Sequence, residues 1–178
     1  GMFARILPAI IAILCALPSF AQATFDAQSS VQDILTSVAP TTTFPHTTTT
    51  ATNRILLVGV HMNLRNATGT TVTSITYAGQ PLTFLDAITD AAPDTRTEVW
   101  YRLNPATGTN NIIVTAGGIT PGQNVESVSS ATTFSNADQS APLSATNIGV
   151  NDPAALTLAG TTTTDVVLSY ISARETVT

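Results

Sequence analysis

The chain has 178 residues, a formal net charge of -5 and only 10% charged residues, and this length suits one domain with its own core. It contains six arginines and no lysine. Because nucleic-acid surfaces need clustered Lys and Arg, whereas these arginines are scattered singly through an acidic chain, we expect no nucleic-acid partner. Threonine fills 33 positions, and its β-branched side chain favours strands over helices.

Residues 1–23 have the order of a secretory signal peptide. Arg5 supplies one positive charge, residues 6–17 are apolar apart from Pro8, and small residues lead up to Ala23. We therefore expect a signal-peptide helix, cleavage after Ala23 and a secreted product, extracellular or at the cell surface.

Two other interpretations of the leader fit less well. A transmembrane helix needs ~20 apolar residues, and this run covers about a dozen, so we expect no membrane span after cleavage. A prepilin-like leader would have glutamate where Ile6 stands. Cys15, the only cysteine, lies inside the leader. The mature chain therefore contains neither disulfides nor a reactive thiol.

Residues 24–53 are rich in Thr and Pro and show little periodic apolarity. We interpret them as an extended lead-in or linker, with one short strand or helix near residues 31–38. The alternative is an ordered loop or edge strand packed against the following domain.

From Arg54 onward, short runs of Ile, Leu, Val and Thr alternate with Gly, Pro, Asn and Asp. This texture predicts an all-β antiparallel sandwich, jelly-roll-like or Ig-like, with about eight or nine strands over residues 54–178. In the first strand, the even-numbered residues should face the core. The expected strands are 54–63, 72–77, 82–85, 96–103, 111–115, 126–134, one near 148–150, 155–158 and 166–173, with hairpin loops at 78–81 and 104–109.

Four phrases in order strengthen this prediction: NRILLVGV at 53–60, VTSITYAGQPLT at 72–83, VWYRLNPATG at 99–108 and ATTFSNADQ at 131–139. Together they resemble the jelly-roll-like β-sandwich modules of large secreted bacterial surface proteins. The resemblance spans about residues 53–173 and implies a structural or adhesive role, without catalytic residues. Such modules are expected to continue beyond the last strand. Either the sequence is a fragment, or a neighbouring molecule supplies a terminal strand.

A candidate ligand site lies in the strand at 96–103, where Glu98, Trp100 and Arg102 alternate with Val99, Tyr101 and Leu103. We expect the apolar trio to face the core and Trp100 to face outward, where it would stack on a sugar of a polysaccharide. Glu98 and Arg102 would bind the sugar hydroxyls. In the alternative, a loop or the lead-in covers Trp100, and the charged residues form ordinary cross-strand pairs.

Asp86, Asp90 and Asp94 fall in an expected loop at 86–94 and are weak candidates for calcium. Their spacing matches no calcium-binding loop, so a solvated acidic loop is preferred and we expect no cofactor. Asp138 and Asp152 are interpreted in the same way.

His46 and His61 are the only histidines, and neither lies in a nucleophile or metal motif, so we expect structural roles for both and no enzyme activity. Carboxylate pairs of the glycosidase kind stay possible in principle, but nothing in the sequence selects a pair. The sequon at 66–68 has no assigned function.

Overall fold

The computed structural model describes residues 9–15, 22–65, 67–90, 95–143, 145–150 and 165–172. All the regular structure in these residues is β, and every strand pairing is antiparallel. The predicted fold class is therefore confirmed. Several predicted features lie outside the described residues: Asn66, Asp94, Asp152 and the strand at 155–158.

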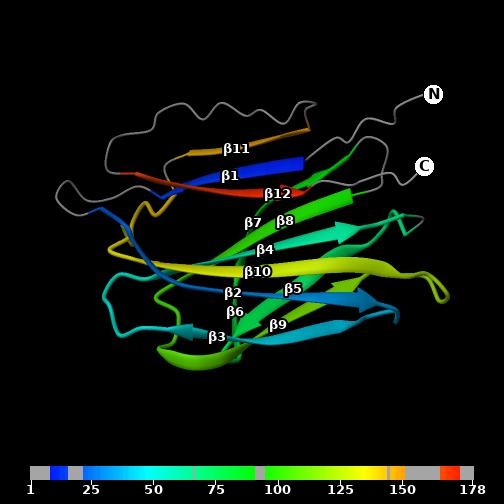
Figure 1. Ribbon diagram of the computed structural model, residues 1–178, viewed down its shortest axis with the longest axis horizontal. Helices are drawn as coiled ribbons and strands as arrows, with labels where there is room; N and C mark the ends of the chain where they lie inside the picture. Colours follow the sequence, from blue (N-terminus) through cyan, green and yellow to red (C-terminus); the bar gives the residue numbers. More distant parts are fainter. Residues whose placement is uncertain are drawn as a thin grey trace.

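Three sheets form three layers (Figure 1), with the central sheet between the other two. The central sheet has the order β2 (Thr24–Leu35), β10 (Val125–Ser135), β4 (Ile55–Asn63), β8 (Thr95–Leu103) and β7 (Thr83–Thr89). The outer sheet has the order β3 (Thr41–Thr48), β9 (Gly108–Gly117), β5 (Thr71–Tyr77) and β6 (Gln80–Pro81). The cover sheet has the order β11 (Ala145–Val150), β1 (Ala9–Cys15) and β12 (Val166–Ser172).

Strand β4 shows why the central sheet is covered on both sides. Its even-numbered side chains, Leu56, Val58, Val60 and Met62, are buried against the outer sheet, as predicted. Ile55 and Leu57 point the other way, into a second apolar cluster that includes side chains of β12. A strand that is apolar on both faces is stable only when both faces are buried.

The segment expected as a lead-in supplies two edge strands of the sandwich. β2 pairs with β10, and β3 pairs with β9. Pro45 lies in β3, where an edge position tolerates the missing backbone N–H. The alternative of packed edge strands is therefore what the structure shows, and the sandwich begins at β2 rather than at Arg54.

Neither expected hairpin loop joins the two strands that were predicted to flank it. Residues 80–81, expected in the first loop, form β6, and the strand that follows, β7, lies in the central sheet whereas β5 lies in the outer sheet. Ala78 and Gly79 connect β5 and β6, and both have positive φ, of 51° and 74°. The second loop, residues 104–109, is not a hairpin loop, because β8 lies in the central sheet and β9 in the outer sheet. Alternating apolar residues show that two strands are each buried on one face. They do not show whether the two strands share a sheet.

The leader was expected to contain a helix, but residues Ala9–Cys15 form strand β1. The run is rich in isoleucine, which suits a strand bonded on both sides, and β1 pairs with β11 and with β12. In the described residues, no helix is long and apolar enough to cross a membrane.

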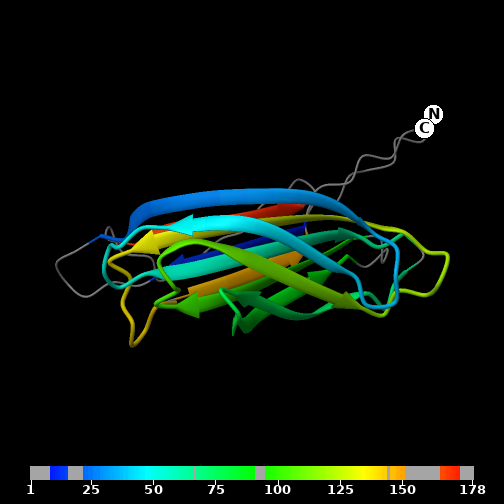
Figure 2. The same ribbon diagram turned by 90° about the horizontal axis from the view of Figure 1, so that it is seen from below.

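The solvent side of the outer sheet is dominated by hydroxyls, and we call it the threonine face. Figure 2 looks onto this sheet from below, with β3 in cyan. The register places Thr41 beside Thr115 and Thr47 beside Thr109. The Oγ1 atoms of Thr47 and Thr109 lie 2.8 Å apart, within hydrogen-bond distance. The threonine face consists of Thr41, Thr43, Thr47, Thr109 and Thr115.

Candidate functional site

The structure places the predicted sugar-binding carboxylate between two sheets, where Glu98 is only 1% exposed. It accepts hydrogen bonds from the Val72 backbone N–H at 2.9 Å, from Arg96 Nε at 2.7 Å and from Trp100 Nε1 at 3.3 Å. The expectation that this face of β8 points to solvent is therefore wrong. The physical reason for this difference is that β8 is buried on both faces, so neither alternating set of its side chains faces outward.

Trp100 and Arg102 lie near the edge where β7 and β6 meet. Trp100 is half-buried against the main core, and the ring of Phe84 meets it edge-on at a centroid distance of 5.3 Å. Arg102 donates to the Pro81 carbonyl at 2.7 Å and to the side chain of Gln80. Phe84 itself is 47% exposed, so the accessible aromatic surface at this edge belongs mainly to a residue that sequence reasoning missed.

The aspartates proposed for calcium do not share one loop. β7 continues to Thr89, so Asp86 lies within a strand, and its Oδ1 accepts a hydrogen bond from the Ala87 N–H at 2.8 Å. Asp90 follows that strand. The loop expected at 86–94 is thus wrong in its first half, because the chain stays paired with β8. Among the described residues, no group of three or more His, Cys, Asp or Glu side chains is placed to hold a metal ion.

The Asp138 carboxylate stabilises the turn in which it lies. Its carboxylate accepts hydrogen bonds from the Ser140 N–H at 2.8 Å, from Ser140 Oγ at 2.7 Å and from the Ala141 N–H at 3.2 Å. These donors hold the pKa of Asp138 below its ordinary value.

His46 joins the two sheets of the sandwich at one edge. Its Nδ1 lies 2.8 Å from Ser29 Oγ on β2, and its Nε2 lies 2.7 Å from Thr133 Oγ1 on β10. Burial lowers the pKa of His46, and the charge of Asp26 opposes this shift more weakly. The ring is therefore neutral at pH 7, with one nitrogen donating and the other accepting.

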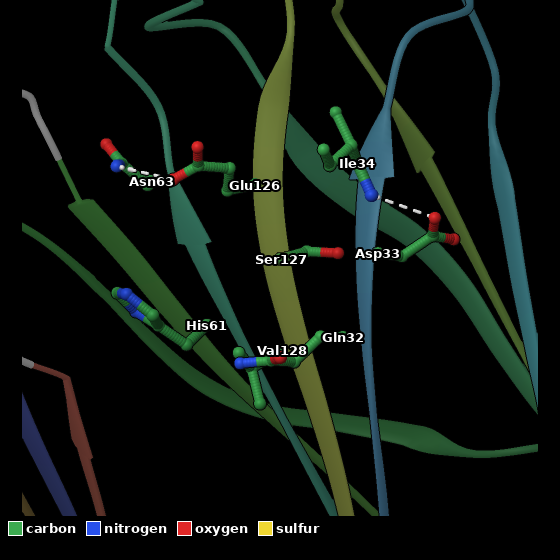
Figure 3. Close-up of a pocket in the computed structure, with 8 residues that line it drawn as sticks. All are labelled: Gln32, Asp33, Ile34, His61, Asn63, Glu126, Ser127 and Val128. Carbon is green, nitrogen blue, oxygen red and sulfur yellow. Dashed lines mark hydrogen bonds between the residues drawn. The ribbon is translucent and has the colours of Figure 1, made fainter.

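An open site among the described residues is a groove on the side of the central sheet that faces away from the outer sheet (Figure 3). We call it the β2–β10–β4 groove, and its volume is about 470 Å³. The register aligns Gln32, Val128 and His61 in one row and places Ile34, Glu126 and Asn63 in the next. Paired residues of antiparallel strands share a face, so all six line the same surface.

Two side chains of the groove are fixed by hydrogen bonds. Glu126 accepts from Arg65 at 2.5 Å and from Asn63 Nδ2 at 3.2 Å. His61 Nδ1 lies 3.3 Å from Thr97 Oγ1. Burial lowers the pKa of His61, and a hydrogen bond to the Arg96 backbone opposes this more weakly. The groove thus offers neutral polar groups, the acidic residues Glu126 and Asp33, and the exposed aliphatic side chain of Ile34.

Comparison of the chain with known protein families, with curated proteins and with solved structures finds no match in any of the three. The resemblance to bacterial surface modules therefore stays a prediction.

Sequence reasoning missed the groove because the eight residues that line it come from three strands that are far apart in the chain. One local signal was present in β4. Ile55 and Leu57 are apolar, and after Gly59 the same face continues with His61 and Asn63. This change from apolar to polar marks the place where the cover sheet ends.

The predicted cleavage residue, Ala23, lies immediately before β2 and is 6% exposed within the second apolar cluster. A peptidase needs an extended, accessible backbone. Cleavage after Ala23 therefore requires that this end of the chain is not yet docked against the sandwich.

Proposed function

We propose that the chain is a secreted, non-catalytic β-sandwich module with a structural or adhesive role at the bacterial cell surface. Its partner would be a polysaccharide or a protein of a cell surface. The signal-like leader and the phrases that resemble surface modules support export. The fold supports a rigid module, since the central sheet is packed on both faces.

The use of the buried polar groups supports a non-catalytic role. Glu98 accepts from the Val72 N–H of β5 and from Arg96 and Trp100 of its own strand, which links β8 to β5. His46 of β3 is held by Ser29 of β2 and Thr133 of β10. Catalytic acids and bases need reach to a substrate proton. These two groups instead hold the sheets together.

The observation that carries the adhesive role is the β2–β10–β4 groove. Its volume falls within the range of ~300–1,000 Å³ that is typical of ligand sites. Its floor is a hydrogen-bonded sheet, so binding there costs little ordering entropy. Gln32, Asn63 and Glu126 suit a partner rich in hydroxyls or amides, and Ile34 adds an exposed apolar contact.

Adhesion is tested with Ile34→Asp and the matched control Ile113→Asp, because Ile34 lines the groove and Ile113 is an exposed isoleucine of the outer sheet, on β9. Beads that carry the exported chain are passed over purified bacterial cell-wall polysaccharide and over intact bacterial cells. We expect Ile34→Asp to reduce retention at least about tenfold, since it removes apolar contact and adds a charge. Equal retention of both variants, or loss with Ile113→Asp only, would contradict the proposal.

Carbohydrate binding as an accessory module of a secreted enzyme is a second candidate function. The observation that favours it is the pair of Phe84 and Trp100, with Phe84 exposed at the edge and Arg102 two residues beyond Trp100 on the same face. An aromatic face of this kind stacks on sugar rings. Titration with soluble cellulose and xylan oligosaccharides should then shift Trp100 fluorescence, and Phe84→Ala should abolish the shift. No shift with either sugar would exclude this candidate for those polysaccharides.

A further inference from the structure

Strand β1, the middle strand of the cover sheet, belongs to the leader segment that we expect to be cleaved off. β1 forms six residue pairs with β11 on one side and seven with β12 on the other. β11 and β12 do not pair with each other. Figure 1 shows the three strands side by side along one side of the molecule. Every residue of β1 falls within the segment 1–23 that we expect to be removed.

The neighbours of β1 show what kind of strand this position accepts. Val166, Leu168 and Tyr170 of β12 pack against the second apolar cluster of the central sheet. The register pairs Leu168 with Ile13 and Tyr170 with Ile11. Paired residues of antiparallel strands share a face, so a strand inserted in this register presents every second residue to the same side as Leu168 and Tyr170. The position therefore suits an uncharged strand with an aliphatic residue at every second place.

Removal of the leader would leave a gap between β11 and β12. Strands that flank a missing strand lie about 10 Å apart, twice the ~4.8 Å spacing of neighbours, and this is too far for backbone hydrogen bonds. Both facing edges would then present unpaired N–H and C=O groups above an apolar floor. Unpaired edges of this kind recruit another strand.

We propose that the position between β11 and β12 is a strand-acceptor site, which binds an extended, uncharged, aliphatic strand of about seven residues from a different polypeptide once the leader has been removed. The inference rests on the proposed export, because only an exported and cleaved chain exposes the site. Surface modules would be linked to their neighbours by main-chain hydrogen bonds on both sides of the inserted strand.

The test uses a chain that begins at Thr24 and a peptide probe with the sequence of residues 9–14, followed by serine in place of Cys15 and a short lysine tail for solubility. We expect saturable binding of one peptide per chain. Hydrogen exchange should show new protection of the amides in β11 and β12 when the peptide binds, because both ladders re-form. Protection in β10 should be unchanged.

The control peptide carries Ile11→Asp and Ile13→Asp. It should bind at least about tenfold more weakly, because both carboxylates would face the apolar cluster. In the acceptor, Leu168→Asp should weaken binding of the original peptide in the same way, while Val167→Asp, at the exposed neighbouring position, should not.

Three results would overturn the inference: no binding of the original peptide, equal binding of the two peptides, or full protection of β11 and β12 without peptide. If that protection is accompanied by a dimer in analytical ultracentrifugation, a second copy of the chain fills the site instead. Leader removal is measured separately, as the N-terminal residue of the protein recovered from the medium. A protein that keeps its leader would contradict the proposed export, whereas the peptide result would stand independently.

Discussion

Glu98 is the residue whose environment differs most from the sequence-based expectation. It is buried between sheets and forms an ion pair with Arg96, with Nε and Oε1 2.7 Å apart. Removing one partner of a buried pair leaves the other charge uncompensated, which typically costs about 3–5 kcal/mol.

We therefore expect Glu98→Leu to lower the free energy of unfolding by about 3 kcal/mol or more in urea denaturation. The matched control is Glu126→Leu at the surface pair with Arg65, where both side chains are about half exposed. Its loss should be at most about 1 kcal/mol. Equal losses at the two positions would show that Glu98 does not stabilise the junction of the sheets.

Ala78 occupies a position that its side chain disfavours. It has a φ of 51° in the two-residue turn between β5 and β6, and Gly79 follows with a φ of 74°. A left-handed conformation costs an L-residue about 1–2 kcal/mol, and Asn-Gly is the preferred pair for such turns. We expect Ala78→Asn to raise the free energy of unfolding by about 0.5–1 kcal/mol.

The control for Ala78→Asn is Ala141→Asn, at an exposed position that does not have positive φ. It should leave the thermal midpoint within about 1 °C of the parent chain, because surface changes away from special backbone positions are usually neutral. A similar rise at both positions would point to the asparagine side chain rather than to the turn.

The two histidines make stability depend on pH. Burial lowers the pKa of His46 and of His61 below the ordinary value of 6.5. The unfolded chain therefore binds more protons than the folded chain once the pH falls below about 6.5. Stability is fully present above that pH and declines as the pH falls through the ordinary value toward the folded-state pKa values.

Between about pH 7.5 and pH 5.5, we expect the free energy of unfolding to fall by roughly 1–3 kcal/mol, since one pKa unit corresponds to about 1.4 kcal/mol per group. The double variant His46→Gln and His61→Gln should be less stable overall but should lose most of this dependence. Urea midpoints at several pH values measure both effects. The pKa of Asp138 lies below an ordinary value of 3.8, so its contribution belongs to a more acidic range. An unchanged slope in the double variant would contradict this account.

At the scale of the strands, β4 was predictable from its sequence and β7 was not. β4 is a continuous apolar run that ends in polar residues, and its bounds agree with the prediction within one residue. In β7, Asp86 and Thr89 resemble loop residues, yet the strand is an edge that pairs with β8 on one side only. Edge strands tolerate polar residues, so composition alone does not separate them from loops. For the same reason, the residues of β2 and β3 were expected to form an extended lead-in rather than strands of the sandwich.

Contact between β12 and the central sheet depends on one glycine. A Cβ at Gly59 would overlap the ring of Tyr170, whereas a Cβ at Gly69 would have its nearest neighbour at 3.8 Å. We expect Gly59→Ala to displace the Tyr170 ring and to cost about 1–3 kcal/mol, with Gly69→Ala nearly neutral. Hydrogen exchange should show a loss of protection in β12 that exceeds any loss in β10. Retained protection in β12 would mean that Tyr170 does not anchor that strand.

At the scale of the molecule, sequence predicted the class of fold but not the number of layers. A run that is apolar on both faces shows that two covers exist and does not identify the covering segments. One cover contains β1, from a segment whose composition predicts a leader. The candidate site was less predictable still. Of its side chains only His61 stands out in the sequence, because the groove exists only once β2, β10 and β4 lie side by side.

The threonine face has a consequence for how the molecule meets its surroundings. Its polarity comes from hydroxyls, and the chain as a whole contains no lysine. Hydroxyls do not titrate in the range where carboxylates and imidazoles do, and counterions do not screen them. The hydration of this face is therefore nearly independent of the salt concentration and of the pH of the solution.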